Sequence, residues 1–434
     1  MAASRRKVVA EQATRQTLAV EKFEIQAFHL VRPQQSRSAA LAGAPPTPTV
    51  PAVVVGGTLN ALGVVRSLSP GRMKIYLLET SRQCAAGWSR HCSYIPTSEP
   101  DGSILVDSLA GLAARLGCRP VLILTSDQSV NCVSERRAEI EALYRISMPP
   151  HAVVRALADK TLFQALAQRE GLAVPRGVCV ADARDIERLD TLQPPLVVKP
   201  ADKTLALKGI VERAVRAETV TVARRVTARM LARAPRIIVQ EWVDGPDTEI
   251  FFTLFSCDRD GKPLGMFPGR KLVCEPPAIG TTAVCVAAPE VADELVALTL
   301  EFIARVGYRG LGSLEFKREA RTGRFLIIEP TVGRTDWQEE IAALCGVNLP
   351  LMTYFGELGE NCPAVAGPSR PIAWRSSAGY RAPRLSGTRT FDGFFRWSDP
   401  LPAVYYYGYE RVLVRLRRKI WALPVRMFAG DAKE

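Results

Sequence analysis

Two glutamates stand in neighbouring apolar runs, where their carboxylates could share a cation. Glu329 follows two isoleucines in the run FLIIEPTVGR, and Glu315 lies within the run LGSLEFK. The segment 311–330 predicts a β-hairpin that turns at residues 321–323, with facing positions about 5 Å apart. Because two carboxylates at that distance repel each other, a positive group should lie between them. Mg²⁺, which prefers hard oxygen ligands, is the first candidate. Arginine partners or solvent exposure are the alternatives.

Three lysines stand at positions where a nucleotide could need them. Lys199 ends the apolar run LVVKP, Lys271 ends another predicted strand, and Lys160 opens a predicted helix. A buried lysine is costly unless it meets an anion. Each lysine could instead extend to solvent or pair with an acid. Together with the two carboxylates, they indicate a triphosphate pocket in which lysines and Mg²⁺ neutralise the phosphates.

The segment QEWVDG, residues 240–245, offers a place for a nucleotide base. A strand that runs into a connecting segment presents backbone N–H and C=O groups, and Trp242 and Val243 add apolar contact. Glu249, just downstream, could bond ribose hydroxyls. The alternative is that Trp242 belongs to the core and that Glu249 lies on the surface of a hairpin.

The elements expected around these residues begin with a β-α-β unit. An apolar strand ending in glycines (52–57), a helical spacing (59–68) and a second strand (74–79) are typical of a doubly wound parallel sheet. A helix is expected over 134–146, with Ser134 as its N-cap.

Further along the chain, the pattern changes from βα units to hairpins. A helix from residue 158 should stop at Gly171. The segment 249–271 predicts a hairpin with Gly261 in its turn, and residues 289–307 have the spacing of an amphipathic helix. This half of the chain is therefore expected to be α+β.

Length and composition fit an ordinary globular protein of two or three domains. The chain has 434 residues, of which 47% are hydrophobic and 23% are charged. No apolar run approaches the roughly 20 residues that a membrane-spanning helix needs. The basic start of the chain has no apolar segment behind it, so a secretory signal is not expected.

Cysteine and histidine usage excludes several kinds of site. The ten cysteines form no C-x-x-C pair, which argues against a zinc site or a redox motif. Most lie in apolar runs, as expected for buried thiols in a reducing cytoplasm. With only three histidines, chemistry built on a histidine base or a multi-histidine metal site is not expected.

The net charge of +13 favours anionic partners, and much of it lies in residues 224–236 and 410–421. A helix over 410–423 would carry a leucine and isoleucine stripe beside an arginine stripe, and could contact an anionic membrane. Alternatively, that helix packs its apolar stripe on its own domain. Nucleic acid is not expected as a partner, because the basic runs lack interleaved aromatic residues.

The order of these motifs resembles the ATP-grasp ligases over about residues 52–360. The matching segments are ADKTLFQALAQREGLAVP, LVVKP, IIVQEWVDGPDTEI, GRKLVCEPPAIGTTA, GSLEFK and IIEPTVGR. VVVGGTLNALGVVRSL resembles the pre-ATP-grasp module of the carboxylate–amine ligase branch, which includes D-aspartate ligase-like and carbamoyl-phosphate-synthase-like enzymes. The resemblance implies an α/β and α+β fold, in which a Rossmann-like pre-ATP-grasp module precedes a two-lobed ATP-grasp fold.

The expected domain organisation follows from this resemblance and from composition. The expected parts are a poorly ordered N-terminal arm (1–50), a pre-ATP-grasp α/β domain (51–150), an ATP-grasp domain (151–365) with a lid at about 175–240, and a C-terminal extension with a basic amphipathic helix (366–434).

The resemblance also assigns roles to single residues. Lys160 and Lys199 would contact ATP phosphates, and Lys271 would lie at the phosphate or substrate side. Glu241 and Val243 would lie at the adenine hinge, and Glu249 at the ribose. Glu315 and Glu329 would bind Mg²⁺, with Mn²⁺ as the alternative metal.

This chain departs from the family's E-x-N-x-R pattern in two places. Thr331 stands where the family has an asparagine ligand, and its hydroxyl would be a weaker metal ligand than an amide carbonyl. Gly333 occupies the arginine position, so that Arg334 comes one place late. Arg334 could still steady the transferring phosphoryl group.

By this resemblance the protein is expected to be an ATP-dependent carboxylate–amine ligase. ATP would convert a small-molecule carboxylate into an acyl phosphate, and a small-molecule amine would attack it, releasing ADP and phosphate. A homodimer is the default oligomer. One alternative is a catalytically degenerate scaffold that binds anions or a membrane. Another is a nicotinamide-dependent oxidoreductase, although Gly56, Gly57 and Gly63 do not keep G-x-G-x-x-G spacing.

Overall fold

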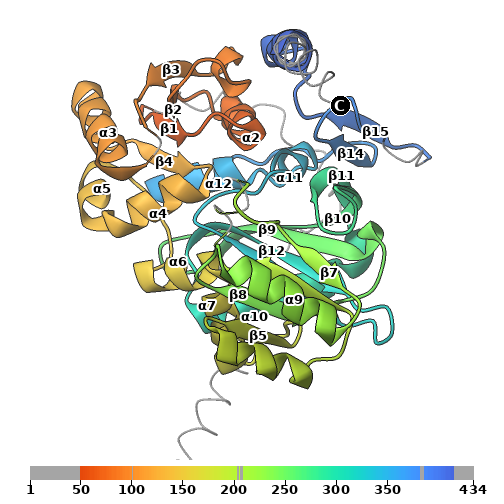
Figure 1. The fold of residues 1–434 in the computed structure, drawn as a ribbon. Coiled ribbons are helices and arrows are strands. Elements are labelled where there is room, and N and C mark those ends of the chain that lie inside the picture. Colours follow the sequence, from red (N-terminus) through yellow and green to blue (C-terminus); the bar gives the residue numbers. More distant parts are fainter. Residues whose placement is uncertain (1–48, 100, 203–204, 206–208, 382–385, 415–434) are drawn as a thin grey trace, which may run out of the picture. The chain divides into compact units, whose positions relative to one another are not determined.

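The structure is a computed structural model that describes residues 49–99, 101–202, 205, 209–381 and 386–414. The expected N-terminal arm, apart from its last two residues, and the expected basic helix beyond residue 414 lie outside the described residues. Within the described residues, the strands form two four-stranded sheets and one seven-stranded sheet (Figure 1).

The first sheet is parallel and has the strand order β3-β2-β1-β4. Its strands are β1 (Ala52–Val55), β2 (Ile75–Glu79), β3 (Ser93–Pro96) and β4 (Val121–Leu124). The helices of this part are α2 (Leu59–Leu68), α3 (Gly102–Leu116), α4 (Asp127–Glu135) and α5 (Arg137–Leu143). The predicted β-α-β opening is therefore confirmed. Because β1 lies between β2 and β4, the helices that follow β1 and β4 begin at the same edge of the sheet.

The prediction that Ser134 caps a helix over 134–146 is wrong. The N-cap of helix α4 is Ser126, eight residues before Ser134, and its side chain accepts a hydrogen bond from the Ser129 backbone N–H at 3.2 Å. Ser134 lies inside α4, with its hydroxyl 2.9 Å from His151 Nδ1. This N-cap, Ser126, lies two residues after the end of β4. The helical spacing of residues 137–143 belongs to the separate helix α5.

The second sheet is antiparallel and has the order β5-β8-β6-β7. Its strands are β5 (Gly177–Val180), β6 (Leu196–Pro200), β7 (Val215–Ala217) and β8 (Ile237–Glu241). Two helices, α6 (His151–Ala158) and α7 (Lys160–Glu170), precede it, and α9 (Val220–Leu231) packs on one of its faces (Figure 1). Buried aliphatic residues of these strands and of α9 form a separate small core.

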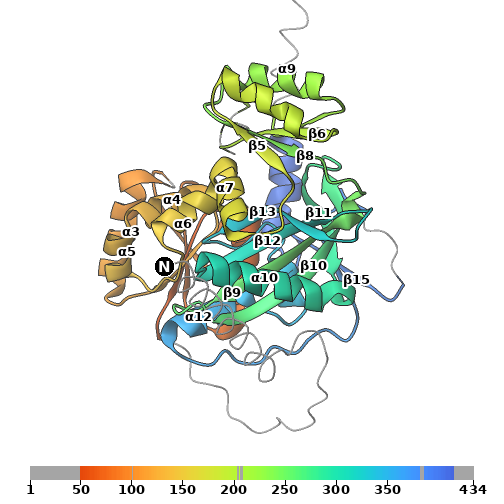
Figure 2. The ribbon, with the colours of Figure 1, turned by 90° about the horizontal axis from the view of Figure 1, so that it is seen from below.

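The seven-stranded sheet has the order β13-β12-β9-β10-β11-β14-β15 and is antiparallel except for its last pair. Its strands are β9 (Ile250–Cys257), β10 (Pro263–Glu275), β11 (Thr281–Ala287), β12 (Gly310–Arg318), β13 (Phe325–Val332), β14 (Ile372–Arg375) and β15 (Arg389–Asp392). Both predicted hairpins are confirmed, and Gly261 has the positive φ (+83°) that its turn requires. Helix α10 (Ala292–Val306) packs against β9 and β10 (Figure 2).

The main hydrophobic core joins the first sheet to the seven-stranded sheet. It includes residues of α2, of β9 and β10, of the short helix α11 (Glu340–Leu344) and of α12 (Leu349–Leu358). Gly63 lies in α2 where α11 approaches closely, because a Cβ at this position would stand 3.0 Å from Glu339 Oε2. Helix packing therefore explains this glycine without a dinucleotide-binding loop. The predicted combination of a parallel α/β part with an α+β part is confirmed.

Glu339 is a fully buried carboxyl group at the start of α11, and it makes stability depend on pH. Ser67 donates a hydrogen bond to its Oε1 at 3.0 Å, while Oε2 has no partner among the described residues. Burial raises the pKa of Glu339 to about 8, which the Ser67 hydrogen bond partly offsets. In the unfolded chain the group ionises near its ordinary pKa of 4.5. Between these two values the folded state holds the extra proton, so stability falls as pH rises, by up to about 1.4 kcal/mol per pH unit.

Glu339→Gln replaces the carboxyl group by a neutral group of similar shape. We expect the decrease in melting temperature between pH 6 and pH 8, two values inside this window, to be clearly smaller in the variant than in the parent chain. Thermal unfolding followed by circular dichroism at the two pH values measures this. Glu360→Gln, at an exposed position, is the control and should keep the parent's pH dependence. Equal pH dependence in the Glu339 variant would contradict the assignment.

All ten cysteines are free thiols; four of them are buried, five are half-buried and Cys118 is exposed. Among the described residues, no helix combines the length and the apolar character needed to cross a bilayer.

Candidate active site

A cavity of about 510 Å³ gathers most of the charged residues that the sequence singled out. We call it the central cavity; its walls include Lys160, Lys199, Lys271, Glu315, Glu329 and Arg334. The elements that contribute to it are the second sheet, the β10-β12-β13 part of the seven-stranded sheet and the carboxyl ends of β1 and β4.

Glu315 and Glu329 face each other across the β12–β13 hairpin, as expected. They are direct register partners, and the next pair on the cavity side joins Ser313 to Thr331. The pairing then skips Ile328, which makes a β-bulge, so that Ile328 and Glu329 both line the central cavity although they are consecutive. The two carboxylates therefore lie on neighbouring strands on the floor of one cavity.

Each of these carboxylates has a lysine beside it. Lys271, on β10, is only 3% exposed and forms an ion pair with Glu315. Burial by itself lowers the pKa of Lys271, but the nearby Glu315 carboxylate outweighs it and raises that pKa above its usual value. Lys160, the first residue of α7, has its Nζ 3.7 Å from Glu329 Oε1. Alternating charges therefore run across the cavity floor.

Two further lysines line the same cavity. Lys199, on β6, donates from Nζ to Gln240 Oε1 at 3.5 Å. Lys317, which the sequence did not single out, donates from Nζ to the Gly245 and Pro246 carbonyls, both at 2.7 Å. Burial lowers the pKa of Lys317. The two-residue period of a strand could have found it, since Glu315 and Lys317 must share a face of β12.

The segment after β8 lines the cavity with Glu241, Trp242 and Val243, the predicted base-binding hinge. The Glu241 carboxylate accepts from the Gln193 backbone N–H at 3.0 Å and pairs with Arg176 at 3.4 Å. Trp242 is thus part of the cavity wall, with the Arg216 guanidinium 4.9 Å from its ring centre. The expectation that this segment borders a pocket agrees with the structure; what it binds stays a prediction.

Glu249, which was predicted to bond a ribose, has arginine partners in the structure. It is not among the described residues that line the central cavity. Its carboxylate accepts from Arg318 Nε at 2.6 Å and from Arg270 Nη2 at 3.5 Å. Arg318 follows Lys317, and Arg270 precedes Lys271; both lysines line the cavity. Because side chains alternate along a strand, the two arginines lie on the opposite face of the sheet. The two arginines therefore hold the Glu249 carboxylate by ion pairs.

Arg334 lies deep in the cavity wall, with its side chain 14% exposed. Its Nε donates to Asp127 Oδ1 at 2.6 Å, and one Nη donates to the Thr335 carbonyl at 2.8 Å. Burial lowers the pKa of Arg334, but Asp127 more than compensates and raises it. Thr331 lines the cavity beside Glu329, and its own carbonyl accepts from the Tyr308 hydroxyl at 3.3 Å.

The first module contributes residues that sequence reasoning missed. Thr58, Asn60, Thr125, Ser126 and Asp127 line the cavity from the ends of β1 and β4. The signal was available, because ligands of doubly wound sheets bind where the strand order reverses, at the carboxyl ends of the strands.

The loop between β10 and β11 also lines the cavity, and Asp247 holds it. One Asp247 oxygen accepts from the Cys274 backbone N–H and the other from the Ala278 N–H, both at 2.8 Å. Ala278 has a φ of +69°, in the left-handed region that residues other than glycine rarely adopt. Asp247 therefore holds this loop in a strained conformation at the cavity.

The donor set fits a divalent metal that shares its coordination with a phosphorylated ligand. Glu315 and Glu329 offer hard carboxylate oxygens from adjacent strands. Among the described residues, no group of three or more acidic, cysteine or histidine side chains could hold a metal by itself. Mg²⁺ suits such an incomplete set, because it is bound through one or two carboxylates and fills its remaining positions with water and phosphate oxygens.

Comparison with known proteins gives matches only at the level of structure. Neither a protein-family model nor a curated protein matches this chain. Among solved structures, the chain is similar to N5-carboxyaminoimidazole synthetase from Staphylococcus aureus complexed with ADP, with a TM-score of 0.58 and 14% identity over 74% of this chain and 80% of that one.

Two other solved structures are similar to the same extent. One is the biotin carboxylase domain of 2-oxoglutarate carboxylase from Hydrogenobacter thermophilus, in complex with MgADP, ADP and bicarbonate; its TM-score is 0.54, with 17% identity over 71% of this chain and 70% of that one. The other is L-amino acid ligase from Bacillus licheniformis, with a TM-score of 0.55 and 14% identity over 71% of this chain and 74% of that one. At these identities the likeness establishes the fold.

Proposed function

We propose that this chain, whose fold is that of the ATP-grasp ligases, acts as an ATP-dependent carboxylate–amine ligase. The observation that carries the proposal is the pairing of Glu315 with Glu329 on the floor of the central cavity, each beside a lysine. The similar proteins include an ADP complex, an MgADP complex and an amino acid ligase, which supports the same chemistry here.

In this proposal the chain's own residues position ATP and neutralise its charge. Lys160, Lys199 and Lys271 would contact the phosphates, and the segment Glu241–Val243 would border the adenine. Glu315 and Glu329 would hold Mg²⁺, which neutralises phosphate charge when bound; Thr331 could add a hydroxyl ligand. Mn²⁺ is the alternative metal, since it prefers the same oxygen ligands.

The reaction would proceed in two steps. A carboxylate oxygen of the acid attacks the γ-phosphorus of ATP, which gives an acyl phosphate and ADP. The amine then attacks the acyl carbon, and phosphate leaves with the C–O bond electrons as the amide forms and a proton is lost. Arg334 lies where it could steady the transferring group, and the loop held by Asp247 would help to exclude water. No protein nucleophile is required.

An ADP-release screen tests the proposal. Amino acids and sugar acids are supplied singly and in pairs with amines, at fixed Mg-ATP, and the products are weighed by mass spectrometry. The expected result is ADP release that requires the acid, and a product equal in mass to acid plus amine minus water. Tight ATP binding without ADP release for any combination would instead favour the degenerate-scaffold alternative. Nicotinamide binding in place of ATP binding would favour an oxidoreductase. The expected location is a reducing cytoplasm.

Removing the loop anchor gives a prediction about ATP affinity. Asp247→Ala deletes the hydrogen bond to Cys274 near the end of β10 and the hydrogen bond to Ala278 in the β10–β11 loop. A hydrogen bond to a charged acceptor contributes roughly 1.5 kcal/mol. If about half of the combined contribution of the two bonds stabilises bound ATP, the KM for ATP should rise about tenfold. Steady-state ADP release at varied ATP measures it. Asp244→Ala, three residues earlier and exposed, is the matched control. An unchanged KM in the Asp247 variant would contradict a role for the loop in ATP binding.

A further inference from the structure

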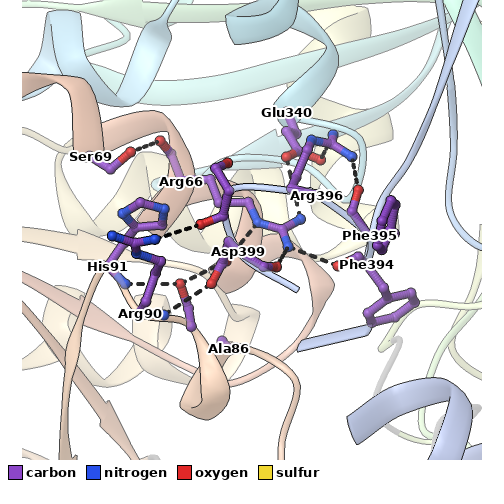
Figure 3. Close-up of polar contacts among 12 residues, drawn as sticks. Arg66, Ser69, Ala86, Arg90, His91, Glu340, Phe394, Phe395, Arg396 and Asp399 are labelled. Carbon is purple, nitrogen blue, oxygen red and sulfur yellow. Dashed lines mark hydrogen bonds and ion pairs between the residues drawn. The ribbon is translucent and has the colours of Figure 1, made fainter. Parts of the chain in front are cut away.

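The segment Gly393–Tyr409 is fixed to the body of the protein by buried ion pairs. Arg66 of α2, 9% exposed, donates from Nε to Asp399 Oδ2 at 3.0 Å (Figure 3). The same guanidinium donates to the Gly393 and Phe394 carbonyls, both at 2.8 Å. Arg396 pairs with Glu340 of α11 at 2.7 Å. The surface that this segment presents is therefore held in place.

That surface carries the most exposed large apolar side chains of the described residues. Trp397 is 87% exposed, Val404 64% and Leu401 50%, whereas the next one, Ile210, is 39% exposed. Leu401 begins the short helix α13 (Leu401–Ala403), and Val404 begins the π-helix η6 (Val404–Val414), so these two residues are one turn apart on one side. We call Trp397, Leu401 and Val404 the apolar patch. An exposed patch of this kind is uncommon unless it contacts a partner.

Arginines and aromatic rings border the apolar patch. Arg90 donates from Nη1 to the Ser398 carbonyl at 3.4 Å, which places an exposed guanidinium beside Trp397. Arg82 lies over the Trp88 ring at 5.3 Å, and Trp88 stacks on Tyr405 at 6.0 Å between ring centres.

The border carries two exposed arginines, Arg82 and Arg90, and one exposed glutamate, Glu410. Tyr405 in turn stacks on Tyr409 at 5.4 Å, and the exposed Glu410 follows directly. Asp399, the acidic residue within the segment Gly393–Tyr409, is buried against Arg66. Apolar side chains together with tryptophan, tyrosine and arginine form the combination found where proteins meet the interface of a bilayer.

The sequence that follows continues the same chemistry. Residues 411–434 contain seven arginines and lysines but only two acids. Five large apolar residues stand among the basic ones: Leu413, Leu416, Ile420, Trp421 and Leu423. Each basic residue near an anionic membrane surface contributes attraction, and apolar side chains contribute by burial. A second copy of this chain would bring like charges together at the patch, so charge argues for an anionic partner.

We propose that the apolar patch and its arginine border dock this protein on an anionic phospholipid surface, with Trp397, Leu401 and Val404 entering the headgroup region. The attachment is peripheral. It is independent of the proposed ligase activity, since none of the three patch residues lines the central cavity.

Sedimentation of the full chain with vesicles tests this. One set of vesicles is phosphatidylcholine alone, and the other contains phosphatidylglycerol as well. The parent protein is expected to sediment with the anionic vesicles and much less with the neutral ones. Trp397→Ala combined with Leu401→Ala should lower the partition coefficient for anionic vesicles by about tenfold or more, because burying side chains of this size contributes at least that factor. Ile104→Ala with Ile210→Ala, exposed apolar positions outside the patch, is the matched control and should bind as the parent does.

Several results would overturn the proposal. One is that the patch variant binds anionic vesicles as well as the parent does. Another is that the parent shows no preference for anionic over neutral vesicles. A third is that vesicle binding is lost only when Arg417 and Arg418 are replaced by glutamine. A concentration-dependent dimer in the absence of lipid, abolished in the patch variant, would assign the patch to a second copy instead. Unchanged thermal unfolding and unchanged ATP binding of the patch variant show that it is folded. They also separate this test from that of the ligase activity.

Discussion

Glu329→Gln is expected to lower ADP formation by at least about 100-fold while leaving the fold intact. The substitution removes one negative charge from the pair that faces the cavity and keeps the shape of the side chain. A neutral amide oxygen is a poor substitute for a carboxylate toward Mg²⁺, and preorganised charge at a phosphoryl-transfer site is worth about two to three orders of magnitude in rate. Coupled ADP-release kinetics at saturating ATP measure the effect.

The same variant should need more Mg²⁺ for half-maximal activity, because the remaining carboxylate on Glu315 binds the ion less tightly by itself. Glu294→Gln is the matched control, since this exposed glutamate lies on α10 and should leave both quantities unchanged. Thermal unfolding checks that the Glu329 variant is folded. Parent-like turnover and an unaltered Mg²⁺ requirement in that variant would refute the metal assignment.

Lys271→Met is expected to lower ADP formation by about 100-fold or more and to destabilise the protein. The Lys271 ammonium is almost completely buried, and its removal leaves the Glu315 carboxylate without this partner. Breaking a buried ion pair on one side typically costs about 3–5 kcal/mol, somewhat less where one partner remains partly exposed as Glu315 does. Under the proposed function, Lys271→Met would also remove a phosphate contact and so lower catalysis in addition.

Two further variants separate stability from catalysis. The double variant Lys271→Met with Glu315→Gln no longer contains the unpaired charge, so its melting temperature should recover most of the loss while its activity should not. Lys262→Met, at an exposed position in the preceding turn, should behave as the parent chain. If the double variant recovered activity along with stability, Lys271 would have only a structural role.

The sequence pattern predicted the parts of the site that depend on local rules. The hairpin over 311–330 followed from two apolar runs and a glycine-containing turn, and direct pairing of Glu315 with Glu329 is a consequence of that register. Lys160 could be placed because Asp159, which caps α7 through hydrogen bonds to two backbone N–H groups, fixes where the helix begins.

The misses depend on arrangements that are distant in sequence. The sequence pattern did not show that Glu249 pairs with Arg270 and Arg318, which lie on two other strands. Asp127 is the first residue of α4, and its ion pair with Arg334, more than 200 positions later in the chain, cannot be read from a local pattern. Strands β14 (IAWR) and β15 (RTFD) include charged residues, so neither forms the apolar run by which the equally short strand β1 (AVVV) could be recognised.

The bulge at Ile328 bears on how relatives of this chain should be aligned. Pairing is regular on both sides of the bulge, so a chain lacking a counterpart of Ile328 could keep its two carboxylates opposite each other. A one-residue gap opposite Ile328 in a sequence alignment is therefore compatible with the hairpin. An alignment that avoids the gap by shifting Glu329 one position would instead place its side chain on the other face of the sheet. Distant homologues compared without such a gap would wrongly lose the acidic position in the alignment.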